Sequence, residues 1–188
     1  MIKELFGKKL SIESERLYLR PIKKSDAEDL YEIFSDSDVM RYYDLLPFKS
    51  MDEAKRQADF FMQGLKNKTM VRWGIELKET KKLVGTCGFF SFSKDDKKAE
   101  MGYELNKNFQ GQGIMSEAIR LILDFIFSTT DINRIEAFIE PPNLASQNLV
   151  KKIGFVKEAD LREYELCRGS LIDISLWALL RADWNKRL

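Results

Sequence analysis

The chain has 188 residues, a formal net charge of +1, and ordinary shares of hydrophobic (44%) and charged (32%) residues. These values are typical of one globular domain, and we expect a single domain over residues 1–188. The near-zero charge excludes a global field that would recruit nucleic acid or an anionic membrane. The absence of histidine excludes His-based catalytic triads and His-ligated metal centres, and we expect no metal.

The two cysteines, Cys87 and Cys167, lie far apart in the sequence and outside any C-x-x-C pair, so they do not indicate a disulfide framework. Neither has a histidine to activate it, which favours packing over nucleophilic catalysis. The first ten residues contain lysines but no apolar targeting segment. No apolar run approaches the roughly 20 residues that a membrane span needs. We therefore expect a cytoplasmic protein without a membrane partner.

The first third of the chain predicts a strand followed by two helices. Residues 15–21 alternate apolar and charged side chains and end at proline, which is typical of a strand. The pattern Ser25-x-x-Glu28 predicts a capping box before a helix that ends near residue 34. After a polar and aromatic loop, Ser50-x-x-Glu53 predicts a second capped helix that continues to about residue 65. These two helices would form one wall of a cleft.

The middle of the chain predicts three strands and a long helix. Residues 71–77 and 83–92 form the expected hairpin, with a polar turn between them. Residues 99–105 alternate apolar and polar side chains, the period of a half-buried strand. From residue 114 to about 128, apolar residues recur at spacings of three and four, which predicts one face of a helix.

The turn between that third strand and the helix reads Gln110-Gly111-Gln112-Gly113-Ile114-Met115-Ser116. A glycine turn at a helix start presents free backbone N–H groups and the positive end of the helix dipole, which suits a phosphate group. The motif is not a P-loop, and Ser116 replaces the third glycine of the dinucleotide fingerprint. A tight loop without a ligand is the alternative.

The last third predicts a strand, a helix and two strands. Residues 134–139 follow a helix, so we expect this strand to lie parallel to the strand before that helix. A helix begins at Asn143 and ends near Ile153, where Gly154 stops it. Residues 155–165 and 171–180 form the expected antiparallel pair around a turn at 168–169. The pattern as a whole predicts a mixed α/β domain.

Two motifs resemble those of the GNAT acyltransferases. Gln110-x-x-Gly113-x-Met115 resembles their Q/R-x-x-G-x-G/A pyrophosphate loop, although Met115 replaces the usual Gly/Ala and Gln110 stands where Trp is often found. Asn143-x-x-Ser146 and Lys152-x-Gly154-Phe155 resemble the N-x-x-S … K-x-G-F signature of the branch that acetylates ribosomal-protein N-termini. The resemblance covers nearly the whole chain. It implies an α/β (α+β) fold with a mixed, mostly antiparallel sheet, whose central parallel strand pair splays into a V-shaped cleft flanked by helices.

The resemblance implies acetyl-CoA as cosubstrate, and it implies that Met115 puts a bulkier side chain beside the pyrophosphate. We expect the cofactor to contact the glycine turn, the strand before it and the start of the last long helix. The implied residues are Tyr103, Glu104, Leu105, Gln110, Gly111, Gln112, Gly113, Ile114, Met115, Ser116, Asn143, Ser146 and Lys152.

Acetyl transfer to an amine needs a base for the amine, a stabilised carbonyl oxygen and a partner for the departing thiolate. The resemblance implies Glu165 as the base, acting through water, and Ser146 as the hydrogen-bond donor to the thiolate. Glu104 is an alternative base. Further competitors are Glu140, Glu158, Glu163 and Tyr164. Helix capping is the other use of Ser and Asn near a helix start.

The resemblance implies direct attack on acetyl-CoA by the N-terminal α-amine of a protein, as in the branch that acetylates ribosomal proteins. A small acceptor such as a polyamine or an aminoglycoside is the first alternative, and a non-catalytic CoA-binding module is the second. The aromatic residues expected in the acceptor groove are Tyr42, Tyr43, Phe89, Phe90 and Phe92. The sequence is compatible with a monomer or a homodimer.

Overall fold

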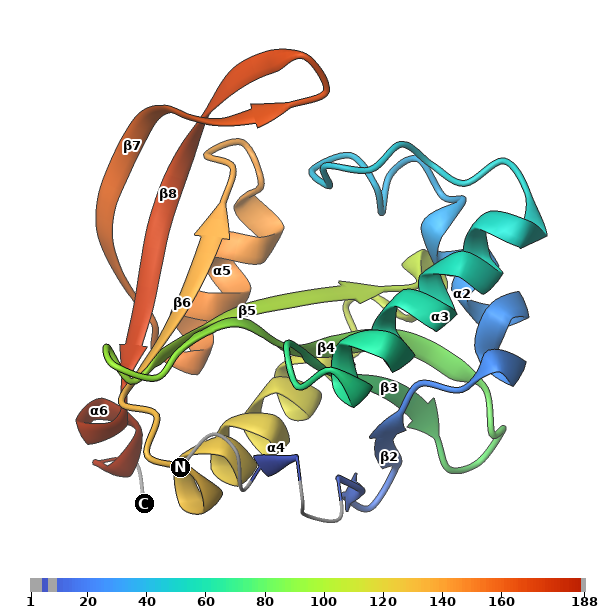
Figure 1. Cartoon of the computed structure of the whole chain (residues 1–188), viewed down its shortest axis with the longest axis horizontal. Helices are drawn as coiled ribbons and strands as arrows, with labels where there is room; N and C mark the ends of the chain where they lie inside the picture. The colour runs from blue at the N-terminus through green and yellow to red at the C-terminus, as the bar shows by residue number, and fades with distance from the viewer. Residues whose placement is uncertain (1–4, 7–9, 187–188) are drawn as a thin grey trace.

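The computed structural model describes residues 5–6 and 10–186, and its described strands form one eight-stranded sheet (Figure 1). The strand order is β1-β2-β3-β4-β5-β6-β8-β7, and every neighbouring pair is antiparallel except β5 and β6. The strands are β1 (Ile12–Glu13), β2 (Leu17–Pro21), β3 (Val71–Leu77), β4 (Leu83–Ser93), β5 (Lys98–Leu105), β6 (Arg134–Ile139), β7 (Val156–Cys167) and β8 (Ser170–Leu180).

Helices cover both faces of this sheet (Figure 1). They are α2 (Ala27–Phe34), α3 (Met51–Lys66), α4 (Ile114–Thr129), α5 (Leu144–Ile153) and α6 (Arg181–Asn185), with short 3₁₀ turns η1 (Lys24–Asp26) and η2 (Lys107–Phe109). The larger hydrophobic core joins α4 and α5 to the sheet. A second core joins α2 and α3 to the opposite face. The mixed α/β fold predicted from the sequence is confirmed.

The two predicted helix starts have different outcomes. Glu53 accepts a hydrogen bond from the Ser50 backbone N–H at 2.9 Å, as the second capping box requires. The predicted box at Ser25 is wrong, because the 3₁₀ turn η1 precedes α2. There, Asp26 accepts from the Lys23 backbone N–H at 2.7 Å and pairs with Arg20. Asp26, the last residue of η1, therefore both caps the start of this turn and takes part in the buried ion pair with Arg20.

The parallel pair β5–β6 separates along its length. The two strands pair only at their beginnings, through Lys98 with Arg134, Ala99 with Ile135 and Glu100 with Glu136. Beyond that point β6 continues against β8, while β5 continues against β4. Figure 1 shows the two strands diverging. Residues 101–105 therefore have an open backbone edge toward the V, as the resemblance implied.

No helix in the described ranges is long and apolar enough to cross a membrane.

Candidate active site

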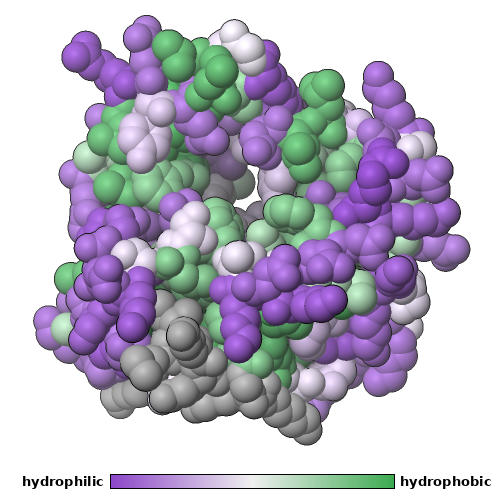
Figure 2. Space-filling model, viewed as in Figure 1, coloured by the Kyte–Doolittle hydropathy of each residue, from purple (hydrophilic) through white to green (hydrophobic). Residues whose placement is uncertain are grey.

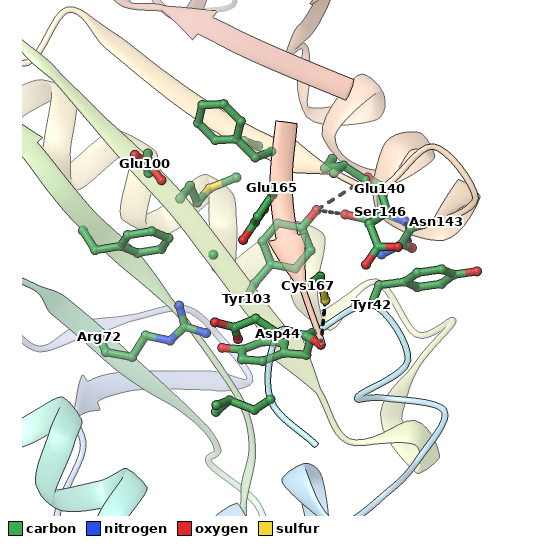
Figure 3. A pocket seen from close by; sticks show the side chains of 18 of the residues that line it. Tyr42, Asp44, Arg72, Glu100, Tyr103, Glu140, Asn143, Ser146, Glu165 and Cys167 are labelled. Atoms are coloured by element: carbon green, nitrogen blue, oxygen red, sulfur yellow. Dashed lines mark hydrogen bonds between the residues drawn. The ribbon is translucent and has the colours of Figure 1, made fainter. Parts of the chain in front are cut away.

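A cleft of about 800 Å³ opens where β5 and β6 diverge. Its walls come from β3, β4 and β5, from β6 and the start of α5, from the β7–β8 hairpin, from α3, and from residues 35–50, which we call the mouth loop. Figure 3 shows side chains of the mouth loop, β5, the start of α5 and the hairpin around the cleft. Among the residues proposed from the sequence, those that line it are Tyr103, Asn143, Ser146, Glu165, Glu140, Tyr42, Tyr43 and Phe90.

The glycine turn, residues 110–116, begins α4 with an unusual backbone. Gly111 and Gly113 both have left-handed φ angles, +75° and +74°. This conformation is strained for residues with a Cβ, so glycine is required here. In the described part of the chain, none of the backbone N–H groups of residues 111–116 donates a hydrogen bond. Together with the α4 dipole, these groups form a site suited to a phosphate.

Arg16 was not among the residues proposed from the sequence. It lies directly before β2 and supports this turn. Its Nη2 donates to the Gln112 carbonyl oxygen at 3.1 Å, and its Nε donates to Glu117 in the first turn of α4 at 2.7 Å. Ser14 donates to the other oxygen of Glu117 at 2.6 Å. These contacts join residues about one hundred positions apart, so no local pattern could have revealed them.

The other side chains of the turn serve the protein itself. Gln110 donates to the Leu105 carbonyl oxygen at 3.1 Å, and Gln112 donates to the Asn108 carbonyl oxygen at 3.1 Å. Ile114 and Met115 are buried in the larger core. The methionine side chain thus points into the core and leaves the turn open, unlike the bulky neighbour of the pyrophosphate that the resemblance implied. Ser116 follows in the first turn of α4.

Lys152 is exposed in the last turn of α5. Its carbonyl oxygen accepts a hydrogen bond from Arg120 of α4 at 3.1 Å, so the two helices are tied together on this side of the sheet. The cation itself lies outside the cleft. A contact of Lys152 with a CoA phosphate stays a prediction.

Two hydroxyl groups meet across the V. The Tyr103 hydroxyl on β5 lies 2.5 Å from Ser146 Oγ on α5 (Figure 3). Burial raises the pKa of Tyr103 to about 12, against the opposing effect of the Ser146 hydrogen bond. Asn143 caps α5, because its Oδ1 accepts from the Ser146 backbone N–H at 3.1 Å. The capping interpretation of Asn143 is therefore correct, and its side chain still lines the cleft.

A bulge in β7 decides which glutamate of that strand faces the cleft. The pairing of β7 with β8 shifts register between Leu161 and Glu165, and Glu163 adopts a left-handed φ of 49°. The Glu163 backbone N–H then donates to Asp173, and the Glu163 side chain is not part of the cleft wall. Glu165 lines the cleft, whereas Glu158 is held in a bidentate pair by Arg134.

Glu104, the alternative base, is buried away from the cleft wall. It pairs with Arg72 and accepts a hydrogen bond from Thr86, and the Tyr43 hydroxyl lies 3.4 Å from it. Burial raises the pKa of Glu104, and Arg72, Thr86 and Tyr43 oppose this rise. A carboxylate with three partners and 5% exposure favours a structural role.

Two further glutamates share the cleft with Glu165. Glu100 stands at the last position of β5 that pairs with β6, and no pattern in the sequence indicated it as a site residue. Glu140 follows the end of β6. Burial raises the pKa of each carboxyl, and the negative charge of Glu165 adds to both shifts. Asp44 and Glu53 also line the cleft. This acidic surface suits a cationic acceptor.

The expected aromatic groove forms in part. Tyr42, Tyr43 and Phe90 line the cleft, but Phe89 packs against Trp73 in the core and Phe92 packs against Phe6. Phe138 and Tyr164 stack on each other with ring centroids 5.7 Å apart. Alternation along β4 places Phe89 and Phe90 on opposite faces of the sheet. The pairing of β4 with β5 shifts register between Phe90 and Ser93, where Ser91 has a left-handed φ of 49°, so the alternation does not extend to Phe92.

The mouth loop is attached to the hairpin by one arginine. Arg168 Nη2 lies 2.6, 2.6 and 2.7 Å from the carbonyl oxygens of Met40, Tyr43 and Leu45. Tyr42 donates to the Pro142 carbonyl oxygen at 3.3 Å, which connects the loop to the start of α5. This side of the cleft is therefore enclosed by segments far apart in the sequence.

Comparison with known proteins identifies the family. An acetyltransferase (GNAT) domain model matches residues 16–156. The chain belongs to the GNAT acetyltransferase family. It is 37% identical to the N-acetyltransferase p20 of Bacillus licheniformis over 175 residues, which cover 91% of this chain and 96% of that protein. It is 26% identical to the [ribosomal protein uS5]-alanine N-acetyltransferase of Escherichia coli, with 94% of each chain covered.

A solved structure extends the likeness to the fold. RimL, a ribosomal L7/L12 α-N-protein acetyltransferase in complex with coenzyme A, superimposes with a TM-score of 0.82 at 22% identity. The match covers 93% of this chain and 99% of that one. This GNAT protein thus has the V-shaped sheet of its family, and its activity is acetyl transfer.

Carboxylate and hydroxyl side chains line one cleft of this GNAT enzyme. Glu165 lines it from β7, and the hydrogen-bonded Tyr103 and Ser146 hydroxyls line it from β5 and α5. No cluster of three or more His, Cys, Asp or Glu residues suited to a metal occurs in residues 5–6 and 10–186. Burial also raises the pKa of the Cys87 thiol to about 12, which disfavours thiolate chemistry there.

Proposed function

We propose that this protein transfers the acetyl group of acetyl-CoA to the N-terminal α-amine of a polypeptide. The observation that carries the proposal is that Glu165 and the Ser146 hydroxyl line the same open cleft. Glu165 would take the proton of the entering ammonium, directly or through water, and so free the nitrogen lone pair. Ser146 would donate a hydrogen bond to the sulfur that leaves.

Bond changes in this reaction follow from the two groups. The amine nitrogen attacks the thioester carbonyl carbon, the C–N bond forms, and the C–S bond breaks with its electron pair going to sulfur. The second proton of the attacking nitrogen goes, through solvent, to the departing thiolate, so the products are the amide and the free thiol of CoA. The glycine turn would hold the pyrophosphate with its free N–H groups, and the open edge of residues 101–105 would pair with the pantetheine arm as an added strand. Asn143 would support this arm beside α5.

Apolar side chains at the mouth favour a polypeptide acceptor. Leu45 and Phe60 line the cleft but are 38% and 56% exposed. Leu166 and Leu171 pair at the end of the β7–β8 hairpin, next to Cys167 of the cleft wall, and are 69% and 57% exposed. Figure 2 shows apolar side chains on both sides of the hollow between the hairpin and the mouth loop. Exposed apolar surface beside a binding cleft is typical of a contact with a larger partner.

A small polyamine is the second candidate, and a different observation favours it. Glu100, Glu140 and Glu165 would together compensate more than one ammonium group. A peptide with one N-terminal charge leaves part of this charge unmatched. The two candidates therefore differ in how many cations the acceptor carries and in how much apolar surface follows the amine.

An amine panel tests the proposal. Release of thiol from acetyl-CoA is followed with peptides that begin with Ser or Ala, with the same peptides blocked at the N-terminus, and with a polyamine and an aminoglycoside. The proposal expects the highest kcat/KM for free peptides and none for blocked ones. It also expects peptides with apolar residues at positions two to four to exceed peptides with glycine there. A higher kcat/KM for the polyamine would replace it with the second candidate, and no thiol release with any amine would indicate a binding module.

A further inference from the structure

The hydrogen bond between Tyr103 and Ser146 spans the V between β5 and α5, beside the open backbone edge of residues 101–105. Tyr103 lies in the part of β5 that pairs with β4 but no longer with β6, and Ser146 lies in the first turn of α5, the helix that follows β6. Their oxygen atoms are 2.5 Å apart, a short distance even for two hydroxyl groups. Figure 3 shows the tyrosine ring reaching across the cleft toward the serine.

The chemistry of the two hydroxyls sets the direction of the bond. A phenol, with an ordinary pKa of about 10, is a stronger donor than an aliphatic alcohol. When Tyr103 donates, the Ser146 hydrogen stays available for another acceptor, and polarisation by the first bond strengthens the second. The raised pKa of Tyr103 keeps the phenol protonated throughout the neutral pH range.

We propose that Tyr103 is a positioning residue for the transfer: its hydroxyl donates to Ser146 Oγ and turns the serine hydrogen toward the departing sulfur. The backbone of Ser146 is already fixed, because its N–H donates to Asn143 at 3.1 Å. Only the serine rotamer remains to be chosen among three staggered positions. The tyrosine selects the one that faces the cleft.

Tyr103 keeps its own proton in this scheme. The electron pair of the broken C–S bond goes to sulfur, the sulfur accepts the hydrogen bond from Ser146, and the phenol supports the serine oxygen as that donation strengthens. The inference rests on the proposed function, because it assumes that Ser146 acts on the leaving group.

A double-mutant cycle with Tyr103→Phe and Ser146→Ala tests this dependence. The chain offers a matched control in Tyr18→Phe, because the Tyr18 hydroxyl donates to Ser11 Oγ at 3.2 Å on the outer strands, away from the cleft. We expect Tyr103→Phe to lower kcat about three- to tenfold, the range of one hydrogen bond, with an unchanged Kd for acetyl-CoA. The Ser146→Ala loss should be larger, and the double variant should be no slower than Ser146→Ala. Tyr18→Phe should keep the kcat of the unmodified protein.

Each other result has a defined meaning. Multiplicative losses in the double variant would overturn the positioning role, since the two hydroxyls would then act independently. A larger loss in Tyr103→Phe than in Ser146→Ala would also overturn it, because the phenol itself would be the donor. An unchanged kcat in Ser146→Ala would refute the proposed role of the serine, whereas a loss there with an unchanged Tyr103→Phe refutes only the inference. Values of kcat are expressed per CoA-binding fraction, so partial unfolding of a variant does not imitate a catalytic loss.

Discussion

The glycine turn, residues 110–116, presents backbone N–H groups from one continuous segment, whereas the proposed acceptor side of the cleft presents side chains from several separate elements. The first surface depends on φ angles that only glycine adopts easily, and it is complete within one turn of chain. The second depends on how β5, β6, the hairpin, α3 and the mouth loop are brought together. A backbone site tolerates many side chains, but a side-chain site changes with each substitution. Donor binding is therefore expected to be robust, and acceptor choice is expected to vary.

The largest expected effect lies on the acceptor side. Glu165→Gln keeps the shape of the side chain but cannot accept a proton, so kcat should fall by about 10²–10⁴-fold, the usual size of general-base catalysis. Raising the pH should restore part of the rate, because more of the amine then arrives deprotonated. The Kd of acetyl-CoA should stay unchanged. Rate–pH profiles of both proteins provide the measurement, and a near-normal kcat at every pH would mean that another cleft carboxylate is the base.

A second substitution tests whether Glu104 stabilises the fold or takes part in the reaction. Glu104→Gln removes the charge that compensates Arg72, which is 5% exposed, so the free energy of unfolding should fall by about 3–5 kcal/mol. Denaturant unfolding measures this loss. Glu163→Gln, on the exposed side of the β7 bulge, is a control that should leave stability nearly unchanged. If Glu104→Gln instead kept full stability and lost only kcat, Glu104 would belong to the acceptor side.

The donor side is tested by its glycines. Gly113→Val should weaken acetyl-CoA binding on the order of 10- to 100-fold, because a left-handed φ strains a β-branched residue by about 1–3 kcal/mol and the N–H groups then lose their alignment. A Cβ at this position meets only Arg16 Nη2 at 3.7 Å, so the fold itself has room. Gly169→Val imposes the same kind of strain at the hairpin turn, where φ is +85° and the space is open. Calorimetry should show weaker binding for the first variant alone, and equal affinities would remove the phosphate role of the turn.

Arg16→Ala sharpens the same side with a smaller effect. The variant loses the hydrogen bond that holds the Gln112 carbonyl and the contact with Glu117, so we expect a two- to tenfold rise in the Kd of acetyl-CoA. Peptide KM should be unaffected, since Arg16 lies outside the acceptor cleft. A rise in peptide KM with an unchanged Kd would break the proposed separation of the two sides.

The smallest expected effect is a pH dependence of stability from the cleft carboxylates. Burial raises the pKa of Glu100 above its value in the unfolded chain, so this group favours folding most below its unfolded pKa and loses that contribution as pH rises through its folded pKa. Glu100→Gln should therefore raise Tm slightly at neutral pH, and the gain should disappear as pH approaches about 4. Thermal melts across this range measure the difference. A gain that persisted unchanged at low pH would show that charge is not its cause.

The sequence by itself determined the elements and the glycine turn. Alternation in residues 99–105, the glycine turn and the helical spacing after it are local patterns, and each follows from the preferences of one short segment. The capping box predicted at Ser25 is wrong because it was inferred from a local pattern alone. A distant partner, Arg20, engages Asp26, and a local pattern contains no information about such a pair.

Only the tertiary structure decided which side chains meet. The bulge at Glu163 turned Glu165 into the cleft, and the separation of β5 from β6 brought Tyr103 against Ser146, 43 residues away. Packing also separates two carboxylates of β5, because Glu104 is buried in a pair with Arg72 away from the cleft wall, whereas Glu100 lines the cleft. These outcomes depend on register and on the approach of distant segments, which the hydrophobic pattern of a single strand leaves undetermined.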